Sequence, residues 1–179
     1  MINLNIGEIK YMENSNEEFW TVLGSCVTVI LHGPNGRATM CHAQMPGPGD
    51  FKNICADSCP KPCYNFLPDS NKFKFVNCAV EYMVKTLSNK GVLSNSLEAS
   101  LIGGSSVIQV EGAISQIGKL NVKAAKEALN RQNIKLVRQM TGGKRGINIW
   151  YRADRDRLLC RYHGDMDKIE LTPGMIIEN

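Results

Sequence analysis

Two strand-like segments on either side of a tight turn signal constrain the fold of this chain more than any other feature. Residues 27–31 read Val-Thr-Val-Ile-Leu, residues 33–36 read Gly-Pro-Asn-Gly, and residues 37–45 again suit a strand. Glycine, proline and asparagine are favoured in tight turns because of their backbone preferences. The sequence therefore predicts a β-hairpin that carries the chain back past residue 26.

This hairpin would bring a thiol close to an imidazole. Cys26 lies in the pentapeptide Leu-Gly-Ser-Cys-Val, just before the first strand, and His42 lies near the end of the second. Pairing the two turn glycines would set Val27 opposite His42, and a shift of one residue would set Cys26 there instead. Side chains directly opposed in an antiparallel pair are about 4.5–5.5 Å apart at Cβ. The hairpin can therefore supply the thiol and the base that a cysteine nucleophile needs.

Cys26 has a structural and a chemical interpretation. A free cysteine is among the most buried residue types, so Cys26 could simply be a core residue. However, Gly24 and Ser25 precede it and leave backbone N–H groups near the sulfur. Such groups can hold the oxyanion of an acyl-transfer intermediate and can stabilise a thiolate. The sequence thus indicates Cys26 as a candidate nucleophile, with the backbone of Ser25 and Cys26 as a candidate oxyanion hole.

A third group in such a site would orient the imidazole. Thr21, on the strand region before Cys26, is a candidate, although β propensity alone explains most threonines in strands. His32, beside the turn, and His163, in a polar segment, are expected at the surface. His42 is therefore the candidate base, and a hydrogen-bonded imidazole buried in a sheet is its structural alternative.

A Cys- and Pro-rich loop at about 46–70 differs in composition from the rest of the chain. Cys55, Cys59 and Cys63 within it could bind zinc or an iron–sulfur cluster. Their spacing is not that of the usual zinc knuckle, and no fourth ligand is implied. We therefore predict neither a metal nor a cofactor, and the alternative for these cysteines is an irregular loop of accessible thiols.

Composition and charge exclude several classes of function. The 179 residues suit a single domain, 1–179, with 43% hydrophobic and 21% charged residues. The net charge of +4 comes without a dense Lys/Arg stripe, which argues against a nucleic-acid partner. No apolar stretch approaches the roughly 20 residues that cross a bilayer, and the N-terminus does not resemble a signal peptide. We therefore expect a cytoplasmic protein with no direct membrane insertion, whose seven cysteines are thiols.

Helical periodicity is confined to two segments. Apolar residues recur at helical spacing in 72–90, and a second helix is expected over 122–131 with Asn121 as its N-cap. The other segments read as about eight strands, which mostly follow one another along the chain. This order predicts an α+β domain with mixed, largely antiparallel sheets flanked by two main helices. Gly103-Gly104 resembles a phosphate-binding loop only weakly, because the rest of that motif is missing.

Several of these segments together resemble the CheD family. They occur in the family's order from about residue 6 to about residue 161, and they are Leu23-Gly24-Ser25-Cys26-Val27, His42, Pro46, Ile102-Gly103-Gly104, Ile117-Gly118, Asn121 and Thr141-Gly142-Gly143. CheD proteins are chemoreceptor glutamine deamidases of bacterial and archaeal chemotaxis. The pentapeptide followed by a histidine is the specific part of this likeness.

The resemblance implies a cysteine hydrolase that converts glutamines in chemoreceptor helices to glutamate and can hydrolyse glutamyl methyl esters. It also implies an α+β fold similar to the catalytic domain of cytotoxic necrotizing factor toxins. Cys26 and His42 match the first two catalytic positions. The threonine that many members carry six residues before the cysteine is Trp20 here, and Thr21 follows it. The third position therefore differs by one register step, which in a strand means a change of face.

A second function stays open beside the first. CheD family members also associate with a CheC-type phosphatase, so the chain could act mainly as a binding module for that phosphatase, with little catalysis. The altered Trp20 position favours this alternative. Chemoreceptor helices are the partner that the deamidase function requires, and the CheC-type phosphatase is the partner that the binding module requires.

Overall fold

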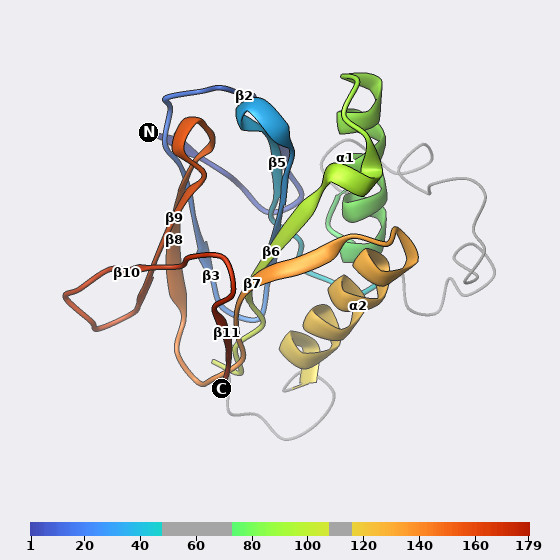
Figure 1. Ribbon diagram of the computed structural model, residues 1–179. Helices are drawn as coiled ribbons and strands as arrows, with labels where there is room; N and C mark the ends of the chain where they lie inside the picture. Colours follow the sequence, from blue (N-terminus) through green and yellow to red (C-terminus); the bar gives the residue numbers. More distant parts are fainter. Residues whose placement is uncertain (48–72, 108–115) are drawn as a thin grey trace.

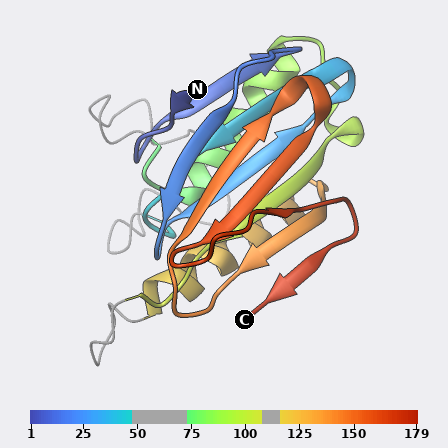
Figure 2. The same ribbon diagram turned by 90° about the vertical axis from the view of Figure 1, so that its left-hand side faces the viewer.

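Two β-sheets pack face to face, and two helices cover the outer face of the larger sheet (Figure 1). The computed structural model describes residues 1–47, 73–107 and 116–179. The smaller sheet has the order β1 (Ile2–Asn3), β3 (Phe19–Leu23), β8 (Ile147–Arg152), β9 (Arg157–Tyr162) and β10 (Ile169–Glu170). The larger sheet has the order β11 (Ile176–Glu178), β7 (Lys135–Thr141), β6 (Glu98–Gly103), β4 (Val27–His32), β5 (Arg37–Cys41) and β2 (Ile9–Glu13). The helices are α1 (Val76–Asn89) and α2 (Ile117–Arg131), which lie behind the sheets in Figure 2.

The predicted α+β class is confirmed. Most neighbouring strands are antiparallel, and β1–β3, β6–β7 and β7–β11 are the parallel pairs among the described residues. Strands β8 and β9 form an antiparallel hairpin in the smaller sheet. More strands form than expected, because segments 2–11 and 169–177 each contribute to both sheets. The first of these segments turns at Gly7, whose φ of 81° lies in the left-handed region that favours glycine.

The helices form where apolar periodicity predicts them, but their starts differ. Helix α1 buries an apolar stripe against the larger sheet, and it begins at Val76 rather than near residue 72. Helix α2 begins at Ile117, five residues before the predicted start at 122. The prediction that Asn121 caps this helix is therefore wrong, because Asn121 lies inside it and its side chain bonds elsewhere.

The predicted hairpin forms with a different register. Gly33 donates its backbone N–H to the carbonyl of Arg37 at 2.7 Å, which leaves residues 34–36 as the turn. Asn35 and Gly36 adopt left-handed conformations, with φ values of 59° and 67°. Pairing Gly33 with Gly36 would leave only residues 34 and 35 in the turn, whereas the observed turn also includes Gly36. Val27 pairs with Ala43 through two backbone hydrogen bonds of 2.9 Å. Both registers considered from the sequence are therefore wrong.

Strand β4 is buried on both faces, and this divides the core in two. Val27, Val29 and Leu31 pack under the helices, whereas Cys26 and Ile30 pack between the two sheets. The predicted loop at about 46–70 lies almost wholly outside the described residues, and so do its three candidate ligands, Cys55, Cys59 and Cys63. Neither helix of the described residues is long and apolar enough to cross a membrane.

Candidate active site

The imidazole of His42 is held by a hydroxyl and a backbone carbonyl. His42 directly follows β5 of the larger sheet, and Thr21 lies on β3 of the smaller sheet. Nδ1 of His42 is 2.8 Å from Oγ1 of Thr21 and 3.3 Å from the carbonyl oxygen of Leu4. The Thr21 hydroxyl in turn donates to the same Leu4 carbonyl at 2.7 Å. The two sheets therefore meet at this imidazole.

These partners assign the tautomer of the neutral imidazole. A threonine hydroxyl has one hydrogen, and because Thr21 gives it to the Leu4 carbonyl, its oxygen accepts from Nδ1. Nδ1 thus faces two acceptors and carries the proton, which leaves the lone pair on Nε2. Nε2 is buried and has no hydrogen-bond partner among the described residues. Buried nitrogen atoms are rarely left unpaired, so the arrangement suits a base that awaits a proton donor.

Cys26 shares a sheet face with this imidazole. The observed register sets Cys26 opposite Gln44 and Thr28 opposite His42. Directly opposed residues share a face, and so do residues two apart on one strand, so all four belong to the face turned toward the smaller sheet. Cys26 and His42 are diagonal neighbours across the pair, a relation with a typical separation of about 7–8 Å. Cys26 is 9% exposed, which leaves a small part of it accessible.

Thr21, and not Trp20, contacts the imidazole. Side chains alternate along β3, and Thr21 is 1% exposed whereas its neighbour Val22 is 41% exposed. Trp20 therefore belongs to the outer face of the smaller sheet, one register step away from the contact with His42. The residue that departs from the usual family pattern is thus not the residue that faces the candidate base.

Burial disfavours charge on both candidate groups. Burial raises the pKa of the Cys26 thiol, although a hydrogen bond from its own backbone N–H acts in the opposite direction. Burial lowers the pKa of His42, although the Leu4 carbonyl opposes this shift. A raised thiol pKa and a lowered imidazole pKa both favour the uncharged forms. Both shifts therefore act against a preformed thiolate–imidazolium pair.

A cavity of about 550 Å³ opens beside His42 and Thr21. Ile6 and Val22 at its edge are exposed apolar residues, and so is the adjacent Met45. Cys26 does not line the cavity. The residues that do so are Asn3, Leu4, Asn5, Ile6, Trp20, Thr21, Val22, His42, Gln44 and Lys74.

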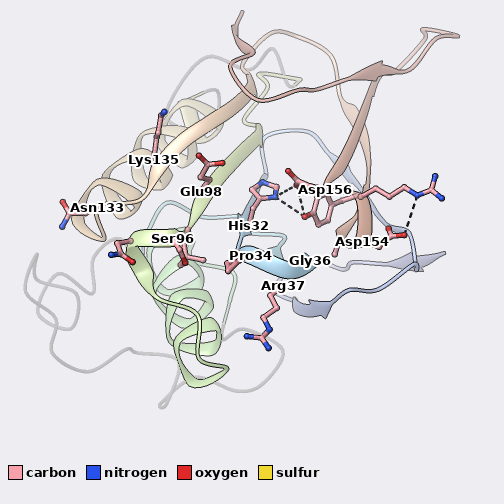
Figure 3. Close-up of a pocket in the computed structure, with 16 residues that line it drawn as sticks. His32, Pro34, Gly36, Arg37, Ser96, Glu98, Asn133, Lys135, Asp154 and Asp156 are labelled. Atoms are coloured by element: carbon pink, nitrogen blue, oxygen red, sulfur yellow. Dashed lines mark hydrogen bonds and ion pairs between the residues drawn. The ribbon is translucent and has the colours of Figure 1, made fainter.

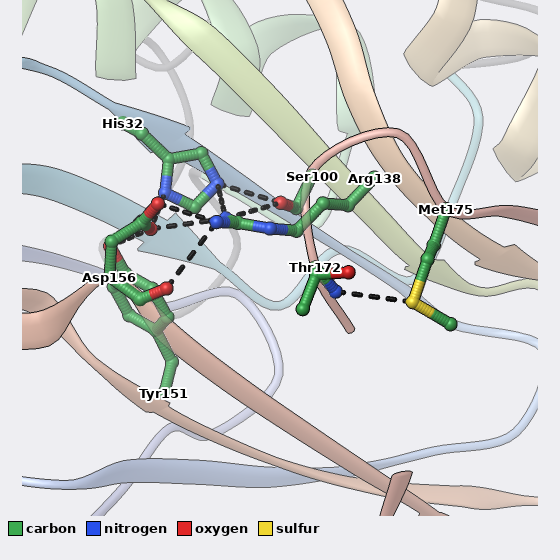
Figure 4. Close-up of polar contacts among 7 residues, drawn as sticks. All are labelled: His32, Ser100, Arg138, Tyr151, Asp156, Thr172 and Met175. Carbon is green, nitrogen blue, oxygen red and sulfur yellow. Dashed lines mark hydrogen bonds and ion pairs between the residues drawn. The ribbon is translucent and has the colours of Figure 1, made fainter. Parts of the chain in front are cut away.

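His32 is buried, so its expected place at the surface is wrong, whereas His163 is exposed as predicted. Residues an even number of positions apart on a strand share a face, so the side chain of His32 points toward the smaller sheet, as that of Cys26 does. Its Nε2 lies 2.7 Å from Oγ of Ser100, and its Nδ1 lies 2.7 Å from Oδ1 of Asp156 (Figure 4). A second cavity of about 690 Å³ borders this histidine (Figure 3).

This second cluster copies the order of a serine–histidine–aspartate triad but cannot act as one. Ser100 is fully buried on β6, a strand inside the larger sheet, and it does not line the cavity. Arg138 occupies the space beside it, 3.3 Å from Nε2 of His32, and forms an ion pair with Asp156. The cluster therefore joins β4 and β7 of one sheet to the β8–β9 hairpin of the other.

Asn121 is the residue at this site whose role the sequence did not predict. It lies in α2 and is fully buried, and its Nδ2 donates to the carbonyls of Ser25 and Gln44 at 2.8 and 2.9 Å. The sequence hinted at Asn121 only through the family resemblance, in which Ile117-Gly118 and Asn121 are matching segments. This resemblance did not predict the hydrogen bonds of Asn121 to Ser25 and Gln44, because those residues are far from Asn121 in the sequence.

A family model and a comparison with individual known proteins identify the same family. The family model described as CheD chemotactic sensory transduction matches residues 65–162, more than half of the chain. A chemoreceptor glutamine deamidase CheD from Thermotoga maritima is 30% identical over 94% of this chain and 96% of its own length. The chain belongs to the CheD family. This second alignment is long enough to span Cys26 and His42, which precede the family-model match.

Other members of the CheD family extend this likeness. A chemoreceptor glutamine deamidase CheD from Bacillus licheniformis is 27% identical over 90% of this chain and 89% of its own length. A probable chemoreceptor glutamine deamidase CheD from Maridesulfovibrio salexigens is 32% identical over 82% of this chain and 78% of its own length. The described α+β architecture is thus that of a CheD-like protein.

Proposed function

We propose that this CheD-family protein deamidates glutamine side chains in chemoreceptor helices to glutamate. Cys26 is the nucleophile, His42 the general base and acid, and Thr21 the group that orients the imidazole. The relatives named as chemoreceptor glutamine deamidases support the reaction. The contact between Thr21 and Nδ1 carries the mechanism, because it leaves an unpartnered Nε2 on the sheet face that also bears Cys26.

The first half of the reaction forms a thioester. Nε2 of His42 takes the proton from Sγ of Cys26 as the sulfur attacks the side-chain carbonyl carbon of the glutamine. The carbonyl oxygen becomes an oxyanion, which the backbone N–H groups of Ser25 and Cys26 stabilise. The intermediate then collapses, the C–N bond breaks, and the imidazolium of His42 gives its proton to the departing ammonia.

The second half releases the product. A water molecule gives a proton to Nε2 of His42 and attacks the thioester carbon, and the sulfur leaves. The thiolate of Cys26 recovers its proton from the imidazolium, and the product carboxylic acid loses its proton to solvent and departs as glutamate. A glutamyl methyl ester would follow the same route with methanol as the first leaving group, so methylesterase activity is a further prediction of this site.

The cavity beside His42 suits a glutamine on an amphipathic helix. Ile6 and Val22 form an exposed apolar rim that can cover the apolar face of such a helix, while the glutamine side chain enters. The exposed Met45 follows Gln44 of the lining and can extend this surface. Lys74 in the lining can pair with acidic side chains on the same helix. The amide meets His42 and Thr21 before it reaches the less accessible thiol of Cys26.

The test follows glutamine in a purified receptor fragment by peptide mass spectrometry and measures ammonia release. We expect the wild type to convert specific glutamines and Cys26→Ala and Cys26→Ser to be inactive. Cys160→Ala is the matched control, because Cys160 is also a buried thiol between the sheets, with a pKa that burial raises to about 12. Conversion by Cys26→Ala at the wild-type rate would exclude the cysteine mechanism.

Association with a CheC-type phosphatase stays a prediction from the family resemblance. The sequence argument for a binding module with little catalysis was the altered Trp20 position. That argument loses force because the contact with His42 comes from Thr21. We therefore favour the enzyme over the binding module.

A further inference from the structure

The loop that carries the candidate nucleophile is held by its carbonyl groups. The carbonyl of Gly24 accepts a hydrogen bond from the backbone N–H of Ser105 at 2.9 Å. The carbonyl of Cys26 accepts one from the backbone N–H of Gly104 at 2.8 Å. Both donors lie directly after β6, so the end of this strand fixes two of the three carbonyls in residues 24–26.

Asn121 holds the third carbonyl and joins the loop to the strand segment of the candidate base. A side-chain amide has two N–H hydrogens, and Asn121 uses them for the carbonyls of Ser25 and Gln44. Ser25 precedes the nucleophile, and Gln44 lies two residues after His42. One fully buried side chain therefore connects the backbone beside the thiol to the backbone beside the imidazole.

The contact with Ser25 also sets the direction of the candidate oxyanion donor. The carbonyl of Ser25 and the N–H of Cys26 belong to one planar trans peptide unit, so they point in opposite directions. Because Asn121 draws this carbonyl toward α2, the N–H of Cys26 points away from α2. That N–H lies against the sulfur of its own residue, where the oxyanion would form.

Two glycines allow α2 to bring Asn121 into this position. Gly118 lies in the first turn of α2, and a Cβ atom there would be 2.4 Å from the carbonyl oxygen of Gly104. Gly104 itself has a φ of +70°. A larger side chain at either position would push the helix away from the loop. Gly104, one of the two glycines that resemble a phosphate loop in the sequence, thus serves close packing of the helix.

We propose that Asn121 is a positioning residue for the reaction at Cys26: it fixes the distance between the nucleophile loop and the base strand and aims the Cys26 N–H at the oxyanion. This inference rests on the proposed deamidase function. Asn121 itself touches no reacting atom and acts through Ser25 and Gln44. Its own Oδ1 has no hydrogen-bond partner among the described residues, so its contribution comes from the two donated hydrogens.

The test compares Asn121→Ala and Asn121→Ser with the wild type on a receptor fragment, below the temperature at which unfolding begins. We expect kcat of Asn121→Ala to fall about 100-fold, as when one oxyanion donor is lost, with KM changed less than about threefold. Asn121→Ser keeps one donor and should lose less. Gln139→Ala is the control, because Gln139 is another buried amide that donates twice, to Thr141 and Glu178.

A second readout is the rate at which chloroacetamide alkylates Cys26 as a function of pH. Loss of the Asn121 contacts should move this profile to higher pH, because the N–H that favours the thiolate is no longer aimed at the sulfur. Simple loosening of the core would expose the thiol and move the profile to lower pH. Gln139→Ala should leave the profile unchanged.

Three outcomes would overturn the proposal: wild-type kcat in folded Asn121→Ala, an equal loss of kcat in Gln139→Ala, or failure of both Asn121 variants to fold. The last result would assign Asn121 to the fold instead of to catalysis. If the wild type releases no ammonia, the proposed function fails. The alkylation profiles then still show whether Asn121 orients the backbone at Cys26.

Discussion

At the scale of single residues, the candidate site depends on where its protons lie. The Thr21 hydroxyl donates to the Leu4 carbonyl and accepts from Nδ1 of His42, so one small group sets both the ring orientation and the tautomer. Neither a carboxylate nor an amide is needed for this purpose. Burial lowers the pKa of His42, and the Thr21 hydroxyl brings no charge to oppose that shift, so the candidate base is weaker than a solvent-exposed imidazole.

We expect Thr21→Val to lower kcat about a hundredfold, at the lower end of the range for general acid–base catalysis. Valine keeps the shape of the residue but leaves Nδ1 without its nearer acceptor. Thr21→Ser should recover most of the activity, because it restores the hydroxyl. Thr86→Val is the control, because Thr86 lies on α1 and does not line the cavity, and steady-state ammonia release is the measurement. Equal rates for Thr21→Val and the wild type would contradict the orienting role.

The alkylation rate of Cys26 should rise with pH through neutrality without a plateau. The raised thiol pKa means that the thiolate fraction grows about tenfold per pH unit until the pH reaches that pKa. A preformed thiolate–imidazolium pair would instead give a rate that is flat from about pH 5 to 7. Chloroacetamide labelling with peptide mass spectrometry measures this profile. A flat neutral region would mean that the resting site is charged.

At the scale of elements, the β8–β9 hairpin joins the two sheets at the end of β4 away from the candidate site. Asp156 ends its turn in a left-handed conformation, with φ of 45°, and directs its carboxylate to His32 and Arg138. Burial raises the pKa of Asp156, but the hydrogen bonds and charges of His32 and Arg138 outweigh this and hold the pKa well below its usual range. The hairpin is thus attached by an ion pair whose arginine is buried.

Asp156→Asn should lower the free energy of unfolding by about 2 kcal/mol at pH 7. The loss is smaller than for a fully buried pair, because the aspartate side chain is 47% exposed. Asparagine tolerates the left-handed backbone, so the change removes the charge and one acceptor oxygen without straining the turn. The folded pKa is lowered, so this stabilisation is present above the unfolded pKa of about 4 and disappears as the pH falls through the folded value.

Urea unfolding at neutral and acid pH measures this effect. The difference between wild type and Asp156→Asn should shrink as the pH falls below about 4. Asp165→Asn is the control, because Asp165 pairs with Arg145 at the surface, where both side chains are exposed, and should change stability much less. A difference that stays constant with pH would show that the carboxylate charge is not the cause.

At the scale of the whole molecule, the candidate site lies where the two sheets meet, and both supply its groups. The larger sheet carries Cys26 and His42, and the smaller sheet carries Thr21. The cavity beside them is rimmed by exposed apolar side chains. We therefore expect substrate binding to depend on apolar rim residues that are distinct from the proposed reacting groups.

We expect Val22→Asp to raise KM for a receptor fragment about tenfold, or 1.4 kcal/mol, with kcat nearly unchanged. Val22 is exposed on the rim, and a carboxylate there would oppose the apolar face of a docked helix. Met166→Asp is the control, because Met166 is 90% exposed and does not line the cavity. A fall in kcat with unchanged KM would place Val22 in the chemistry instead of in binding.

The sequence predicted what depends on local patterns. Apolar periodicity found both helices, and the turn residues found the hairpin that carries Cys26 and His42. It did not predict the register, because the left-handed conformations of two turn residues add one residue to the turn. It missed the burial of His32 and the contacts of Asn121, because both depend on how distant segments pack.

The carbonyl of Leu4 gives the first few residues an importance that their position at the edge of the smaller sheet does not suggest. It is the acceptor that fixes the Thr21 hydroxyl, and through it the imidazole of His42. Amino-terminal clipping after residue 5 would therefore leave every proposed reacting side chain intact while freeing the ring to rotate. Proteolysis at this end would inactivate such an enzyme while leaving its nucleophile intact.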